Sequence, residues 1–318
     1  MKQAIISGST GLIGSALVRR LVAHGVDVLA LGRKPWSEVD PKRLTADGRL
    51  TYVQLDMSRI DTLGELVRQA GWACGGSCAF FNFAWYGASR LSDMEVDAQM
   101  RNVAWSAAAL QAAGQIGCRR FVHVGTMEEA FTERYLELDF RTNTEFNRHV
   151  IYALAKRSSR DVLKLLAGKA GIDLMFATNS HAMGPNDDKD SFLQVTLGKL
   201  ISGAELLFST GEQMFDVLSA KDCALAYHLI GTHGKAGRSY RVGSGAARPL
   251  KEYVQIMADL YPSGQVLQFG KMPYNDISLD PSDFSIDSLV EDTGFRPTQT
   301  YEDAVRDLYQ WLVNGTYQ

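Results

Sequence analysis

Short, uninterrupted apolar segments alternate with helical patterns through the first 178 residues of the chain. The apolar segments that predict strands lie at residues 3–7, 26–31, 52–55, 78–84, 120–124 and 173–177. Their apolar character is continuous rather than alternating, which indicates burial on both faces of a sheet. The helical segments between them lie at residues 12–23, 59–70, 93–113 and 150–167. This alternation predicts βαβ units with right-handed crossovers, and hence an α/β fold with a parallel sheet.

The second half of the chain is less regular, and the pattern breaks near Asn179. Helices are predicted at residues 192–202, 222–229, 250–260 and 301–312, and a loop-rich segment at 270–283. The sequence contains no visible repeat and no linker typical of two independent domains. We expect one domain from residues 1–178, to which the chain returns near 214–243. A smaller C-terminal lobe is expected from residues 179–213 and 244–318.

A glycine-rich loop joins the first predicted strand to the first predicted helix. Its spacing is G-x-x-G-x-x-G, at Gly8, Gly11 and Gly14. Glycine permits a tight turn and lets a pyrophosphate approach the backbone, while the helix N-terminus offers unpaired N–H groups. The alternative is a purely structural turn. In this position the loop predicts a Rossmann-type, doubly wound sheet that binds a dinucleotide, with contacts from Gly8, Thr10, Gly11, Leu12, Ile13 and Gly14.

The end of the second predicted strand bears on the choice of cofactor. NAD sites commonly place an acid there, whereas this chain has Gly32, Arg33 and Lys34. Arginine binds phosphate through charge-assisted hydrogen bonds, so NADP(H) is favoured over NAD(H). An ordinary solvated pair of cations is the alternative. Asp56, followed by Met57 after the third strand, is expected to accept from the adenine amino group or to cap a helix.

Composition limits the class of protein. The chain has 318 residues, 33 Lys and Arg against 36 Asp and Glu, and a formal charge of −3, which argues against a nucleic-acid binder. No apolar stretch approaches the roughly 20 residues that span a bilayer, and the N-terminus does not resemble a signal peptide. We therefore expect a cytoplasmic protein without nucleic-acid or membrane partners.

The four cysteines, Cys74, Cys78, Cys118 and Cys223, include no C-x-x-C zinc or redox signature. The spacing favours free, mostly buried thiols in a reducing compartment. No metal site is expected.

Tyr152 and Lys156 lie four residues apart in a predicted helix and share one face of it. A nearby ammonium stabilises a phenolate, so such a pair suits proton exchange with a carbonyl oxygen. The alternative is a packed tyrosine beside a surface lysine. Thr126 follows the fifth predicted strand, and loops at the carboxyl ends of parallel strands are where such sheets place chemistry.

With these motifs, the chain resembles the extended short-chain dehydrogenase/reductase family, also called the NAD-dependent epimerase/dehydratase family. The similarity is strongest to the branch that modifies nucleotide-activated sugars, through the segments GSTGLIG, VGTMEE, YALAK, MGPND, FDVLSAKD and GFRP. It implies that the C-terminal lobe binds substrate. It also implies that Tyr152 is the general acid/base, that Thr126 hydrogen-bonds the reacting oxygen and that Lys156 holds the nicotinamide ribose. Phe83 and Ala84 would lie beside the cofactor.

The resemblance leaves two reactions open. Thr126-Met127-Glu128 matches the Thr-x-Glu segment of some nucleotide-sugar 4,6-dehydratases, but Met127 stands where many of them have Asp and cannot donate a proton. In sugar ketoreductases of the family, Glu129 would be the matching acid. We expect an NADP(H)-dependent reduction of a 4-keto-6-deoxy sugar nucleotide, with Tyr152 as proton donor. The alternative is a dehydratase or epimerase with a tightly bound cofactor and Glu128 as acid/base.

Substrate contacts and assembly are further expectations. The family's usual diphosphate-binding arginine is Phe215 here, and Arg248 is a candidate replacement. Trp85, Met127 and His181 are candidate sugar contacts, although aromatic residues after a core strand more often pack in the core. The resemblance also implies a homodimer, in which the helices at 93–113 and 150–167 pair with those of a second copy.

Overall fold

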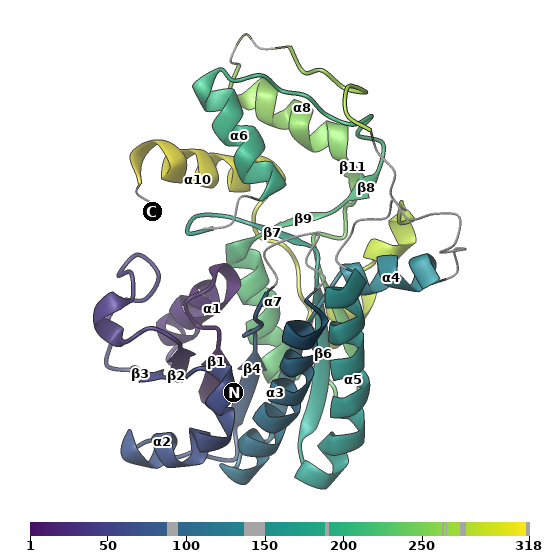
Figure 1. Cartoon of the computed structure of the whole chain (residues 1–318). Helices are drawn as coiled ribbons and strands as arrows, with labels where there is room; N and C mark the ends of the chain where they lie inside the picture. The colour runs from purple at the N-terminus through teal and green to yellow at the C-terminus, as the bar shows by residue number, and fades with distance from the viewer. Residues whose placement is uncertain are drawn as a thin grey trace.

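A seven-stranded parallel sheet forms the centre of the computed structural model (Figure 1). The structure describes residues 1–87, 95–136, 150–187, 191–262, 264, 266–273 and 278–315, and of 133–136 the backbone alone. The strand order is β10-β6-β5-β4-β1-β2-β3. The strands are β1 (Gln3–Ser7), β2 (Asp27–Gly32), β3 (Leu50–Gln54), β4 (Cys78–Asn82), β5 (Arg120–Thr126), β6 (Asp173–Asn179) and β10 (Ser239–Val242). This topology confirms the predicted Rossmann-type, doubly wound α/β fold.

Helices cover both faces of the sheet, which explains the continuous apolar strands. In β1, Ala4 and Ile6 face one apolar cluster and Ile5 faces the other. The first cluster packs against α1 (Leu12–Ala23), α7 (Ala220–His233) and α9 (Asp287–Thr293). The second packs against α2 (Leu63–Gln69), α3 (Val96–Gln115) and α5 (Val150–Ala170). Both sides of every central strand are therefore buried, as expected for a parallel sheet.

The strand order reverses beside β1, which pairs with β2 on one side and β4 on the other. Ser7, the last residue of β1, lies opposite Leu31 and Asn82. Loops that leave such a switch point diverge and open a crevice at the carboxyl ends of the strands. The glycine-rich loop begins at this point.

A smaller lobe lies beyond the carboxyl ends of the strands (Figure 1). Its apolar cluster includes residues of three helices, α6 (Phe192–Ser202), α8 (Leu250–Leu260) and α10 (Tyr301–Asn314). Short two-stranded sheets connect it to the larger domain: β7 (His181–Met183) with β9 (Val217–Ser219), and β8 (Met214–Phe215) with β11 (Arg248–Pro249). The helices at 192–202 and 250–260 begin and end where the sequence predicts.

Several elements differ from the sequence predictions. The segment predicted as one helix, 59–70, is a 3-10 helix η2 (Met57–Thr62) followed by α2, with Arg59 non-helical at φ −119°. Strand β4 ends at Asn82, so Phe83 and Ala84 belong to the following loop. The helix predicted from Asp93 is described from Val96, and Asp93 lies outside the described residues.

Elements that the sequence analysis did not predict include α4 (Glu128–Leu136), β10, α9, the short helices η1 (Trp36–Glu38) and η3 (Pro281–Phe284), and the four short strands β7, β8, β9 and β11. Helix α4 is polar (EEAFTERYL), and β10 is a four-residue edge strand (SYRV). Neither carries the long apolar pattern on which such predictions depend. Among the described residues, no helix combines the length and the apolar character that crossing a bilayer requires.

Candidate active site

The glycine-rich loop packs too closely for side chains at two of its three glycines. Gly8 has φ +68°, and a Cβ there would lie 2.9 Å from the Ala84 nitrogen. A Cβ on Gly14 would overlap the Gly8 carbonyl oxygen. Gly11 caps α1 and therefore leaves the N–H groups of the first helical turn without a covering side chain. This cradle fits a pyrophosphate group, because the anion can approach bare backbone at the positive end of a helix.

Neighbouring segments fix the loop in place. Ser9 donates from its backbone N–H and its hydroxyl to the carbonyl oxygen of Leu31, at 3.2 and 2.9 Å. Arg43 donates to the carbonyl oxygen of Thr10 at 2.6 Å. Phe83, which follows β4 beside the loop, packs edge-on against Tyr227 with ring centroids 4.6 Å apart. The loop is therefore pre-formed rather than dependent on a ligand for its shape.

Packing explains why β2 ends in glycine instead of an acid. A Cβ at Gly32 would overlap the hydroxyl of Tyr52 on the adjacent strand β3. The same hydroxyl donates to the carbonyl oxygen of Lys34 at 2.6 Å, and Gln54 donates to that of Arg33 at 3.0 Å. These hydrogen bonds fix the backbone of Arg33 and Lys34, whereas the side chains of both residues are exposed. They present positive charge at the edge of the cofactor crevice.

Asp56 caps η2, as one of its two predicted roles. Its Oδ1 accepts from the Ser58 N–H at 2.9 Å. This backbone hydrogen bond is the main cause that lowers the pKa of Asp56, and the charge of Arg33 adds to it. The contact with adenine, and the role of Met57 beside it, stay predictions.

Thr126, Tyr152 and Lys156 come together at the carboxyl end of β5. The hydroxyls of Thr126 and Tyr152 form a hydrogen bond, which lowers the pKa of Tyr152, but burial outweighs it and raises that pKa well above its ordinary value. Lys156 is 3% exposed, and its Nζ lies 5.8 Å from the centre of the Tyr152 ring. The spacing of four residues thus places both groups on the face of α5 that the sequence predicted.

Trp85 completes this cluster from the loop after β4. The Lys156 Nζ lies 3.9 Å from the centre of its ring, and the ring packs edge-on against Tyr152 at 6.0 Å. Its indole N–H donates to Gln99 at 2.8 Å. Gln99 and Asn102, both buried in α3, also hydrogen-bond the backbone of Tyr86. Sequence reasoning missed Gln99, because only the fold brings a polar side chain of α3 against this loop.

A hydrogen bond of Lys156 links the cluster to the sheet. Its Nζ donates to the carbonyl oxygen of Val124 at 2.8 Å. The ammonium is therefore buried between a strand carbonyl and the face of an aromatic ring, both of which stabilise a cation.

The two adjacent acids after Thr126 have different environments. Glu129 accepts from the Thr126 N–H at 2.9 Å and forms an ion pair with Arg160 at 3.1 Å. Gly125 leaves room for this carboxylate, because a Cβ there would overlap it. Arg160 also donates to Thr178 and thereby ties α5 to β6. The Glu129 carboxylate thus links the end of β5 to α5.

Glu128 is the first residue of α4, and its N–H lies 3.3 Å from the Thr126 hydroxyl oxygen. The charges of Glu128 and, to a smaller degree, Glu129 raise the pKa of Tyr152. Glu128 is therefore near enough to the proposed proton donor to influence its titration.

Two histidines lie near the crevice. His123, predicted as a core residue, is buried in β5, and burial lowers its pKa well below the ordinary value. Its Nδ1 lies 3.3 Å from the amide nitrogen of Asn82. His181 begins β7, and burial lowers its pKa to about 4. In the described part of the chain, its Nε2 has no hydrogen-bond partner. The substrate contact of His181 stays a prediction.

Arg248 and Thr126 line different cavities. Its guanidinium lies over the Tyr253 ring, 5.1 Å from the centroid, and lines a cavity of about 260 Å³ in the lobe. Thr126 lines a different hollow of about 420 Å³. Met127 is partly exposed at the start of the loop into α4. The substrate roles of Arg248, Met127 and Trp85 stay predictions.

Comparisons with known proteins agree with this geometry. Residues 4–243 match the model of the NAD dependent epimerase/dehydratase family. A dTDP-glucose 4,6-dehydratase of Xanthomonas campestris pv. campestris is 23% identical over 62% of this chain, and the match spans 59% of that relative's length. A dTDP-6-deoxy-L-talose 4-dehydrogenase (NAD(P)(+)) of Kitasatospora kifunensis is 24% identical over 98% of this chain and 95% of the relative.

The comparison with solved structures shows the same fold. The crystal structure of a dTDP-glucose 4,6-dehydratase from Streptomyces venezuelae, with NAD and TYD bound, superposes with a TM-score of 0.74. It is 22% identical and the match covers 98% of this chain and 97% of that one. Because the family model matches most of the chain, the protein belongs to the NAD dependent epimerase/dehydratase family. The predicted resemblance is confirmed at this level.

We expect Glu129→Gln to destabilise the fold more than Glu128→Gln. Loss of the Glu129 charge leaves Arg160 without its carboxylate partner, and both side chains are less than one-fifth exposed. A charged hydrogen bond of this kind contributes roughly 1–3 kcal/mol to the free energy of unfolding. Glu128→Gln, at a helix N-terminus, should cost less than about 1 kcal/mol. Urea unfolding of both variants measures this difference, and an equal or reversed order would contradict the structural role of Glu129.

Proposed function

We propose that the protein is an NADP(H)-dependent oxidoreductase that reduces the 4-keto group of a nucleotide-linked 4-keto-6-deoxy sugar. The observation that carries this proposal is the hydrogen bond between Thr126 and Tyr152, next to the buried Lys156. This arrangement would supply one proton, from the Tyr152 hydroxyl, to the oxygen of the sugar carbonyl. Met127, the residue after Thr126, offers no acid for the removal of water. The similarity to a sugar-nucleotide 4-dehydrogenase over nearly the full chain supports the same reaction class.

The cradle formed by Gly8 and Gly14 fits the pyrophosphate of a nicotinamide dinucleotide, which when bound supplies the hydride. Thr126 would orient the sugar carbonyl by donating a hydrogen bond to its oxygen. Tyr152 would donate its proton to that oxygen as the hydride reaches the carbon, so a ketone becomes an alcohol. Burial and the neighbouring acids raise the pKa of Tyr152, which keeps the hydroxyl protonated at neutral pH and suits a proton donor.

Lys156 would act on this step in two ways. Its charge, next to the Tyr152 ring, stabilises the phenolate that remains after proton transfer. The family resemblance also assigns it to the nicotinamide ribose. Trp85 covers the lysine on one side and would reduce its contact with water.

A dehydratase or epimerase is the second candidate, because Glu128 lies close enough to raise the pKa of Tyr152. A carboxylate at this position could remove the C5 proton and return it as water leaves. The relatives named as dTDP-glucose 4,6-dehydratases support this reading. In such a reaction the hydride returns to the same substrate, so the cofactor shows no net change.

The assay that separates the two reactions follows NADPH absorbance while nucleotide-linked 4-keto-6-deoxy sugars are supplied. We expect stoichiometric loss of NADPH and the appearance of the sugar alcohol. Conversion of a nucleotide-linked hexose with loss of one water and an unchanged NADPH signal would refute the reductase. Glu128 would then be the first residue to substitute.

A variant arm of this assay tests the proton donor. Tyr152→Phe keeps the ring that packs against Trp85 but removes the proton, so turnover should fall by about 10²–10⁴ while cofactor binding is retained. Tyr309→Phe is the matched control, because Tyr309 stacks on Tyr261 in the lobe, far from Thr126 in the fold. Wild-type turnover in Tyr152→Phe, when chemistry limits the rate, would exclude the assignment.

The preference for NADP(H) is a separate proposal, supported by the exposed Arg33 and Lys34 and by the side-chain-free Gly32. The solved relative from Streptomyces contains NAD, so the two cofactors must be compared directly. Arg33→Ala should weaken NADPH binding about tenfold or more and leave NADH binding nearly unchanged, because only NADPH has the 2′-phosphate. Arg49→Ala is the control, since Arg49 pairs with Asp27 at the other end of the sheet. Equal affinities of the wild type for NADH and NADPH would overturn the preference.

We also propose that two copies assemble through α3 and α5. These helices pack side by side (Figure 1), and Leu165 of α5 is 77% exposed, an unusual environment for leucine. Light scattering should give about twice the chain mass of 35.0 kDa for the wild type and a lower mass for Leu165→Glu. A wild-type mass of one chain would exclude the dimer.

The cytoplasmic location stays a prediction.

A further inference from the structure

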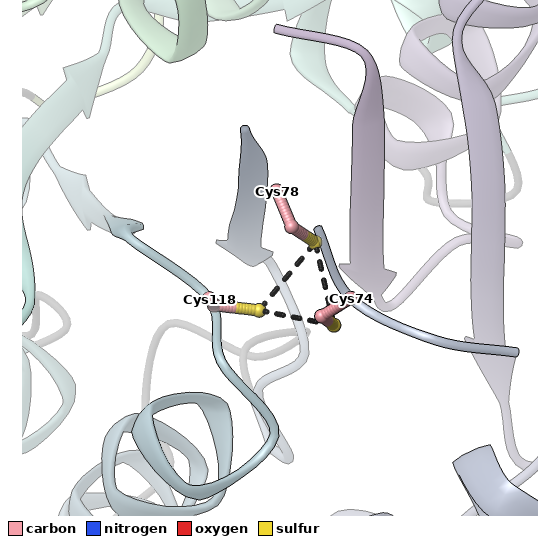
Figure 2. Close-up of side chains that lie close together, drawn as sticks. All are labelled: Cys74, Cys78 and Cys118. Carbon is pink, nitrogen blue, oxygen red and sulfur yellow. Dashed lines mark hydrogen bonds between the residues drawn. The ribbon is translucent and has the colours of Figure 1, made fainter. Parts of the chain in front are cut away.

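Three of the four cysteines converge at the end of the sheet opposite the candidate active site (Figure 2). The Sγ atom of Cys78 lies 3.5 Å from that of Cys118 and 3.6 Å from that of Cys74, and the third distance is 3.8 Å. Cys78 is the first residue of β4, whereas Asn82 ends it near the cofactor crevice. The cluster is therefore separate from the proposed reaction and does not depend on it.

Backbone and side-chain contacts hold each cysteine in position. The Gln3 amide accepts from the Gly75 N–H at 2.6 Å and donates to the Ala73 carbonyl at 2.9 Å, which fixes the segment that contains Cys74. The Cys118 N–H donates to Ala113 at the end of α3. These contacts are independent of the thiols, so the cluster is pre-formed by its scaffold.

Arg119 donates from its N–H to the Cys78 carbonyl at 3.1 Å, which aligns the start of β4 with the segment before β5. The pairing continues as Ala79 opposite Arg120. The positions of Cys78 and Cys118 are therefore consequences of sheet register.

The spacing of the three sulfur atoms matches one face of a tetrahedral metal site. With Zn–S bonds of about 2.3 Å, tetrahedral geometry places the sulfur atoms about 3.8 Å apart. The observed distances of 3.5, 3.6 and 3.8 Å fall close to this value. A planar three-coordinate ion with equal bond lengths would need about 4.0 Å. The cluster can thus accept an ion with shifts of a few tenths of an ångström.

We propose that Cys74, Cys78 and Cys118 bind one Zn²⁺ ion as thiolates, with water as the fourth ligand. Thiolates select soft or borderline cations, of which Zn²⁺ and Cu⁺ are the biological candidates. Cys78 and Cys118 are buried, at 0% and 3% exposure, while Cys74 is partly exposed and leaves a path for the ion and for water. Within the described part of the chain, no His, Asp or Glu joins the group, so water is the available fourth ligand.

The bound ion would fasten two segments that are distant in sequence, the one with Cys74 and Cys78 and the one with Cys118. Cys118 lies 40 residues from Cys78 and 44 from Cys74. Ion binding requires loss of the thiol protons, and because the unfolded chain lacks this arrangement, binding stabilises the folded state. The ion would act as a structural staple between β4, the loop before it and the loop that leads into β5.

The test starts from the full-length protein, reduced and freed of metal by a chelator, and measures Zn²⁺ uptake against a colorimetric chelator. We expect one Zn²⁺ per chain, protection of the partly exposed Cys74 from alkylation, and a higher melting temperature. Co²⁺ in place of Zn²⁺ should give the near-ultraviolet absorption of thiolate-to-cobalt charge transfer.

Cys74→Ser is the informative variant, because Cys74 is partly exposed and its replacement should leave the fold intact. It should weaken Zn²⁺ binding at least tenfold and reduce the cobalt absorption, because two of the three thiolates remain. Cys223→Ser, at a buried cysteine of α7 outside the cluster, should bind Zn²⁺ as the wild type does. Circular dichroism of each variant confirms that the fold is retained.

Three results would overturn the proposal. The first is no Zn²⁺ uptake by the reduced wild type with its three thiols intact. The second is equal Zn²⁺ affinity in Cys74→Ser and the wild type. The third is uptake of Cu⁺ alone, which would retain a thiolate site but exclude zinc as its ion.

Discussion

Burial of the sheet on both faces is the constraint on which the rest of the structure depends. Consecutive residues of β1, such as Ile5 and Ile6, enter opposite apolar clusters. A slip of the strand by one residue would therefore move each side chain to the other face of the sheet. The fixed register brings the carboxyl ends of the central strands to one edge. The glycine-rich loop, the Trp85 loop and Thr126 leave the sheet at that edge, and the candidate active site is assembled from them.

Within this site, the sequence neighbours Glu128 and Glu129 show how position decides role. The Glu129 carboxylate forms an ion pair with Arg160 and accepts a hydrogen bond from the Thr126 N–H. The other begins a helix and influences the titration of Tyr152. Two acids of the same chemistry thus have different surroundings, although the charges of both raise the pKa of Tyr152. The family resemblance alone could not assign them, because both match an acid found in relatives.

The parts predicted from sequence are those encoded locally. The glycine-rich loop occupies seven residues, and Tyr152 and Lys156 are four apart, so periodicity places them without knowledge of the fold. The contacts that the sequence did not reveal join distant residues: Glu129 with Arg160, 31 positions apart, and Trp85 with Gln99 of α3. The cysteine cluster was missed for the same reason. Polar α4 and the short edge strand β10 lack the apolar pattern and depend on their neighbours for stability.

The hydroxyl of Tyr52, packed where a side chain of residue 32 would project, has a consequence for the cofactor site. A side chain introduced at Gly32 would meet the Tyr52 hydroxyl, so the tyrosine would have to move. A change of nucleotide preference through residue 32 would therefore involve either a new position or a replacement of the Tyr52 side chain. The residue at position 32 is thus coupled to the aromatic side chain at position 52, and not to charge alone.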